Sequence, residues 1–87
     1  MKLKGGFILK NVAGTNVVVP VGTNTVTFKA IITLNDTGAF LWQQLEKGCT
    51  KDDLLELMVK EYSVDRSTAA ADISEFIDNL KKAELLE

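Results

Sequence analysis

The sequence of 87 residues predicts one α+β domain in which a three-stranded antiparallel β-meander is followed by a three-helix bundle. Two observations predict this order. In residues 26–34, apolar residues alternate with mostly polar ones, which is the period of a half-buried strand. After Leu34 the apolar residues recur every three or four positions, which is the period of a helix face. A chain of this length buries one modest core, so residues 1–87 are expected to form a single domain.

Three segments before residue 35 have the composition of short strands, rich in β-branched and aromatic side chains. These segments are residues 7–12, 17–21 and 26–34. Residues 13–16 separate the first two, and residues 22–24 separate the second from the third; both connections contain the Gly and Asn that favour tight turns. Because tight turns join neighbouring strands, the three strands should form an antiparallel meander.

Three helices are expected between residues 35 and 83, and each begins after a side chain that can cap it. The candidate caps are Asn35 or Asp36 for the first helix, Thr50 for the second, and Asp65 or Ser67 for the third. Asp53 lies three residues after Thr50, which is the spacing of a capping box. The third helix, residues 67–83, has a wide apolar face. The members of this face are Ala70, Ile73, Phe76, Ile77 and Leu80.

The expected packing follows from the small size of the sheet. Three strands cannot cover both of their own faces, so the helices should pack against one face. A small sheet beside three short helices is a winged-helix-like arrangement. The other face of the sheet, or one of its edges, then remains available to a partner.

The residue types of catalytic and metal sites are scarce. Histidine, the usual general base and metal ligand near neutral pH, is absent, and Cys49 is the single cysteine. The sequence also lacks the glycine-rich loop that cradles phosphates. Asp72, Glu75 and Asp78 recur at intervals of three on the third helix, and a solvated outer face is the simplest interpretation of them. We therefore predict a protein that is not an enzyme and that needs no cofactor and no metal.

The distribution of charge bears on the partners. Residues 1–34 contain four lysines and no acidic residue, whereas all 12 acidic residues lie in residues 35–87. Three of these acidic residues, Asp72, Glu75 and Asp78, lie along the third helix and disfavour contact of that helix with nucleic-acid phosphates. No apolar run approaches the roughly 20 residues of a membrane span, and no signal peptide is recognisable, so a cytoplasmic protein with no membrane partner is expected.

A resemblance to a known family rests on residues 34–42, Leu-Asn-Asp-Thr-Gly-Ala-Phe-Leu-Trp. This segment resembles the Leu-Asn-Glu-Thr-Gly-Ala-x-x-Trp signature of the PqqD-like family, with Asp36 where the family often has Glu. Residues 61–65 and the Leu-Leu pair at 85–86 also match, so the resemblance covers nearly the whole chain. The signature residues are expected to serve the fold, as helix cap and core.

The resemblance implies a winged-helix-like domain that acts as a peptide chaperone. Such a domain binds the leader segment of a ribosomally made precursor peptide and presents it to a modifying enzyme, often a radical SAM protein. The leader adds as a strand to the third β-strand and rests against the third helix. The alternative function is that of a winged-helix adaptor between proteins or of a DNA-binding regulator. Homodimer formation is compatible with both.

The resemblance also implies which residues hold the leader. The third strand would offer its backbone at Phe28, Lys29, Ala30, Ile31, Ile32 and Thr33, and the third helix would offer an apolar wall of Ala69, Ile73, Phe76, Ile77 and Leu80. Spacing alone leaves open which of these helix residues face the groove and which face the core. Lys29 and the other lysines of the strand half predict a leader that is acidic to amphipathic.

Overall fold

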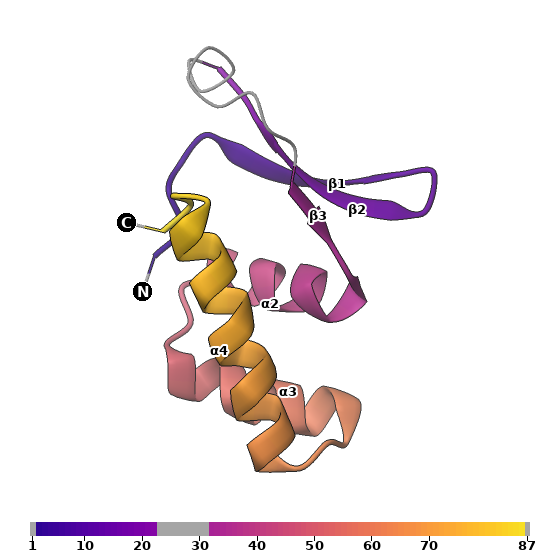
Figure 1. Ribbon diagram of the computed structural model, residues 1–87, viewed down its shortest axis with the longest axis vertical. Helices are drawn as coiled ribbons and strands as arrows, with labels where there is room; N and C mark the ends of the chain where they lie inside the picture. The colour runs from indigo at the N-terminus through magenta and orange to yellow at the C-terminus, as the bar shows by residue number, and fades with distance from the viewer. Residues whose placement is uncertain (1, 23–31, 87) are drawn as a thin grey trace.

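The computed structural model describes residues 2–22 and 32–86, and Figure 1 shows a small sheet above three helices. The strands are β1 (Phe7–Val12), β2 (Thr15–Pro20) and β3 (Ile32–Leu34), and the helices are α2 (Asp36–Glu46), α3 (Lys51–Tyr62) and α4 (Arg66–Lys82). The predicted order of three strands followed by three helices is confirmed. Within the described ranges, no helix is both long enough and apolar enough to cross a membrane.

The three strands form an antiparallel sheet in the order β1-β2-β3, which is the predicted meander. Residues paired across the sheet share a face, and the row of Leu9, Val18 and Ile32 packs against the apolar core. Val18 is 1% exposed, whereas Ile8, on the opposite face, is 36% exposed. The helices therefore cover one face of the sheet, as expected. Residues 26–31 of the predicted third strand lie outside the described residues.

The turn between β1 and β2 is tighter than predicted. The sequence predicted a turn over residues 13–16, but Thr15 and Asn16 are the first residues of β2, so only Ala13 and Gly14 form the loop. Both have positive φ angles, 52° and 84°, as in a two-residue hairpin loop of type I′. Alanine fits this left-handed region less well than asparagine or glycine, because its Cβ crowds the following carbonyl oxygen.

We therefore expect the substitution Ala13→Asn to stabilise the protein. Asn-Gly is a favoured pair for type I′ turns, and relief of a left-handed alanine should contribute about 0.5–1 kcal/mol. Urea unfolding followed by far-UV circular dichroism measures the change. Gly14→Ala is the matched control, because a Cβ there would meet no atom within 4 Å, so its expected loss of stability reports backbone strain alone. An Ala13→Asn variant no more stable than the parent would contradict this explanation of the turn.

Each helix begins after a side chain that caps it, and the structure decides between the alternatives. The observed caps are Asn35 for α2, Thr50 for α3 and Asp65 for α4. Asn35 Oδ1 accepts a hydrogen bond of 2.7 Å from the amide of Gly38. The predicted capping box of Thr50 and Asp53 is confirmed, with both of its hydrogen bonds at 3.1 Å.

The cap of α4 makes stability depend on pH. Hydrogen bonds from Thr68, first from its side chain and then from its backbone amide, hold the pKa of the Asp65 carboxyl below its usual value of 3.8. A lowered pKa in the folded state contributes stability above the unfolded value, and this contribution is lost as the pH falls through the folded value. We expect Asp65→Asn, which retains a capping side chain, to lose less stability than the parent between about pH 5 and pH 2. Thermal unfolding of both proteins over this range tests the prediction, and parallel curves would contradict it.

The core lies between the sheet and all three helices. Trp42 of α2 and Ile73 of α4 are each 1% exposed and belong to the same apolar cluster. On α4 the fully buried alanine is Ala69, whereas Ala70 is exposed, so the predicted place of Ala70 in the buried stripe is wrong. Both alanines fit helical spacing, but the buried face is centred on the side of Ala69, Ile73 and Leu80.

Candidate functional site

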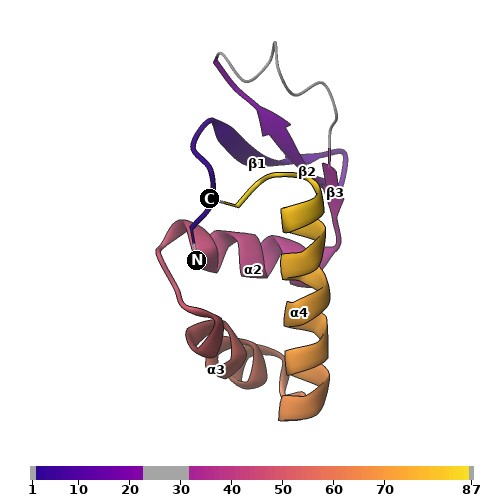
Figure 2. The same cartoon turned by 60° about the vertical axis from the view of Figure 1, so that its left-hand side comes forward.

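Strand β3 lies at an edge of the described sheet. It pairs with β2 on one side, and among the residues that the structure describes no strand pairs with its other side. Figures 1 and 2 show β3 descending toward α2 while α4 rises toward the sheet, so β3 and α4 run in opposite senses. An edge strand presents N–H and C=O groups with which another extended chain can pair.

A groove of about 230 Å³ lies between β3, the beginning of α2, and α4. Its described lining residues are Thr33, Leu34, Asn35, Thr37, Gly38, Leu41, Asp72, Glu75, Phe76 and Asn79. The most deeply buried side chains among them are Leu41 and Phe76, which are 1% and 7% exposed. These two side chains give the groove an apolar floor, next to the open edge of β3.

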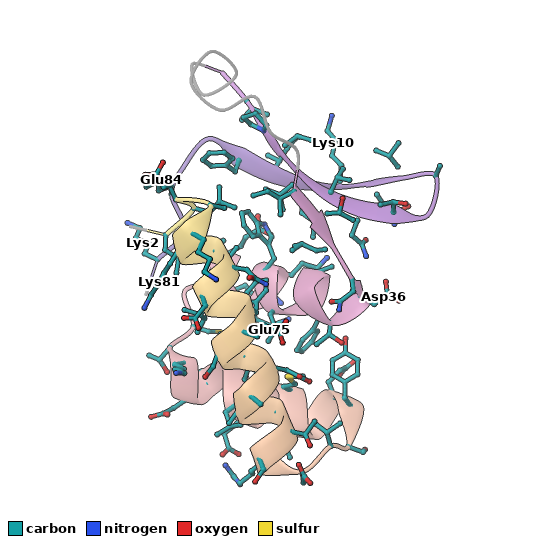
Figure 3. The ribbon with its side chains drawn as sticks, in the orientation of Figure 1. Lys2, Lys10, Asp36, Glu75, Lys81 and Glu84 are labelled. Carbon is teal, nitrogen blue, oxygen red and sulfur yellow. The ribbon has the colours of Figure 1, made fainter. Side chains whose placement is uncertain are left out.

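Helix α4 contributes one continuous stripe to this groove. Asp72, Glu75, Phe76 and Asn79 follow the spacing i, i+3, i+4 and i+7, which places them on one face of a helix. Phe76 is buried, whereas the other three are exposed. Figure 3 shows Glu75 on α4, with Asp36 marking the beginning of α2. The groove therefore has a polar, acidic wall on the α4 side above its apolar floor.

The corner between β3 and α2 is held close by the signature segment. Asn35 caps the helix, and a Cβ built on Gly38 would lie 3.2 Å from Asn35 Oδ1 and 3.4 Å from Leu34 Cβ. Glycine at this position lets the first turn of α2 approach the end of β3. Asn16 of β2 donates a hydrogen bond of 3.0 Å to Asp36 Oδ1, which ties the corner to the sheet. The expectation that the signature serves the fold is confirmed for the cap.

The residues predicted to hold the leader occupy three different environments. Thr33 and Phe76 line the groove. Ile32 is half-buried against the core. The helix residues Ala69, Ile73, Ile77 and Leu80 are at most 5% exposed and belong to the core cluster. The strand residues Phe28, Lys29, Ala30 and Ile31 lie outside the described residues.

Sequence reasoning missed the acidic part of the groove wall. It assigned Asp72, Glu75 and Asp78 together to a solvated outer face, but the structure places Asp72 and Glu75 along the groove. Asp78 is exposed on α4 and is not a lining residue. A signal was present in the sequence, because the first two carboxylates share a helix face with Phe76 and the third does not.

The arrangement offers binding chemistry. Within residues 2–22 and 32–86, no three His, Cys, Asp or Glu side chains lie together as potential metal ligands. The thiol of Cys49 is half-buried and is not among the groove residues. An open strand edge, an apolar floor and two carboxylates can together bind an extended peptide through its backbone and through its side chains.

Comparison with known proteins gives a family and two similar folds. The family described as coenzyme PQQ synthesis protein D (PqqD) matches residues 15–86. A solved structure of "TbiB1 in Complex with the TbiA(beta) Leader Peptide" has a TM-score of 0.80 and 28% identity, and covers 100% of this chain and 95% of that chain. A "Lasso peptide synthetase B1 complexed with the leader peptide" has a TM-score of 0.78 and 24% identity, with coverage of 99% and 95%, and supports the fold alone. Curated protein sequences gave no significant match.

Proposed function

The chain belongs to the family of coenzyme PQQ synthesis protein D, and from this membership we propose that it binds the leader segment of a ribosomally made precursor peptide. The observation that carries the proposal is the groove between the open edge of β3 and α4. The similarity to a protein solved in complex with a leader peptide supports it. A domain with such a site can deliver a peptide to an enzyme without carrying out chemistry itself.

Binding would proceed by strand addition. The leader pairs with the free edge of β3 in antiparallel orientation, and main-chain hydrogen bonds supply affinity that depends little on sequence. Successive side chains of a strand point to opposite faces, so every second leader side chain enters the groove and meets Phe76 and the α4 wall. The side chains in the groove then select among leaders.

The partners follow from this role. The leader remains on this chain while a separate modifying enzyme, of which a radical SAM protein is one class, acts on the rest of the precursor peptide. The chain itself is non-catalytic, without a cofactor, and works in the cytoplasm, where precursor peptides are made. Homodimer formation remains a prediction, and a dimer that paired through the edge of β3 would compete with the leader.

Nuclear magnetic resonance on the full chain, labelled with ¹⁵N, tests the proposal. Synthetic peptides that cover the leader regions of short reading frames beside the gene are titrated into the protein. Amide signals of Thr33 and Leu34 in β3 and of Phe76 in α4 should shift and saturate. Signals at Glu56, on the exposed surface of α3, serve as the internal control and should not move. Binding that leaves β3 unperturbed, or no binding by any of these peptides, would contradict the proposal.

A further inference from the structure

The charge of the groove has one sign among the residues that the structure describes. Asp72 and Glu75 are the charged lining residues, and neither Lys nor Arg is among the described ones. The ion pair between Arg66 of α4 and Glu56 of α3 does not involve either groove carboxylate. Both carboxylates are exposed. The wall therefore carries two negative charges without a cationic partner in the described part of the chain.

From this we propose that the groove selects a peptide that places a Lys or Arg side chain over Asp72 and Glu75. The inference rests on the leader-binding function proposed above and names the chemistry of the leader at this site. Charge complementarity requires the peptide side chain that faces these two carboxylates to be positively charged. A peptide with Asp or Glu at the same position would be repelled and would leave three carboxylates close together.

The apolar floor favours the same kind of side chain. Lys and Arg have long aliphatic stems that bury well against apolar surface while the charged end remains in water. Over this groove the stem would lie against the exposed edge of Phe76, and the charged end would reach the two carboxylates at the rim. Arg can also donate two parallel hydrogen bonds to one carboxylate, which makes it the better fit of the two.

The directions of β3 and α4 predict where the basic residue lies in the peptide. A leader antiparallel to β3 runs in the same sense as α4, because β3 and α4 run in opposite senses. The stripe from Asp72 to Asn79 is about 10 Å long at roughly 1.5 Å per residue, and side chains on one face of a strand repeat every ~7 Å. Two consecutive inward side chains therefore fit along it. The basic one comes first and meets the carboxylates, and the second, two residues later, meets the end near Asn79.

This inference changes the charge expected of the leader. The lysines of the strand half predicted an acidic-to-amphipathic leader. Lys10, the one of these lysines that lies in a described strand, is on β1, and β2 separates that strand from the open edge of β3. Lys29 lies outside the described residues. At the groove itself, the described charges favour a cation, so the leader is expected to be amphipathic with a basic residue among its groove-facing side chains.

Selection from a display library of random 12-residue peptides on the full chain tests the inference. Parallel selections use the double variant Asp72→Asn, Glu75→Gln and the control Asp78→Asn, which removes an exposed charge of α4 outside the groove. We expect peptides from the parent to share Lys or Arg at one position of a common motif. That enrichment should disappear with the double variant and persist with Asp78→Asn.

Affinity measurements on one selected peptide make the test quantitative. Exposed ion pairs are individually weak, so replacing the basic residue by Gln, which removes its attraction to both carboxylates, should weaken binding to the parent about three- to tenfold at low salt. The same replacement should have no effect on binding to the double variant. Peptides that bind at β3 without any basic preference would overturn this inference and leave the leader-binding function intact. A library that yields no specific binder would overturn the leader-binding function as well.

Discussion

The substitution Phe76→Ala should both destabilise the protein and weaken peptide binding. Phe76 is 7% exposed, belongs to the core cluster and also lines the groove. Truncating a buried phenylalanine typically costs about 3–5 kcal/mol, and small domains have only about 5–15 kcal/mol in total. In the proposed complex the ring would also contact the groove-facing side chain of the peptide, so the folded fraction should bind about tenfold more weakly, which corresponds to ~1.4 kcal/mol.

The control for Phe76 is another core residue of the same helix. Leu80 is 1% exposed and is not a groove residue, so Leu80→Ala should lose about 2–5 kcal/mol of stability with unchanged affinity in its folded fraction. Urea unfolding gives the folded fraction of each variant. Titration with a peptide that binds the parent, under conditions where both variants are mostly folded, gives the affinity. If the two variants bind equally well, Phe76 is only a core residue.

The beginnings of the helices could be predicted because their causes are local. A capping side chain lies within three residues of the amide that it binds, so sequence alone narrowed the start of α2 to two candidates and predicted the capping box of Thr50 and Asp53. The choice of Asn35 over Asp36 depended on where the chain leaves β3, which is a tertiary property. The predicted length of the β1–β2 turn was wrong for a related reason. The residues between the two strands are compatible with a two-residue loop and with a four-residue loop, and the pairing between the strands determines which one forms.

The wall of the groove could be predicted only in part. Spacing showed that Phe76 lies on the apolar face of α4, but an apolar face this wide contacts both the core and the groove. Which flank faces β3 depends on how α4 is rotated in its packing against α3 and the rest of the core. That rotation places Asp72 and Glu75 at the groove and leaves Asp78 outside it. The charges on this flank of α4 can therefore be identified in the sequence, but their position at the groove can be recognised only from the fold.

Trp42 of the signature segment has an unusual environment for a buried tryptophan. Its side chain is 1% exposed, and among the described residues its Nε1 has no hydrogen-bond partner. A buried donor left unpaired costs about 1–3 kcal/mol. The ring meanwhile fills a large share of the core beneath the sheet, so burial of its apolar surface must outweigh that cost.

Trp42→Ala and Trp42→Phe should therefore differ widely in stability. The alanine variant loses the whole ring and should be about 3–5 kcal/mol less stable than the parent. The phenylalanine variant loses part of the ring but also removes the unpaired N–H, so the two effects offset each other and the net loss should be below about 1.5 kcal/mol. Because Trp42 is the only tryptophan, unfolding must be followed by far-UV circular dichroism in place of fluorescence. A phenylalanine variant as unstable as the alanine variant would contradict this account and would mean that the N–H is hydrogen-bonded in solution. Water in the open pocket of about 410 Å³ that Trp42 lines together with the N-terminal segment would be the simplest partner.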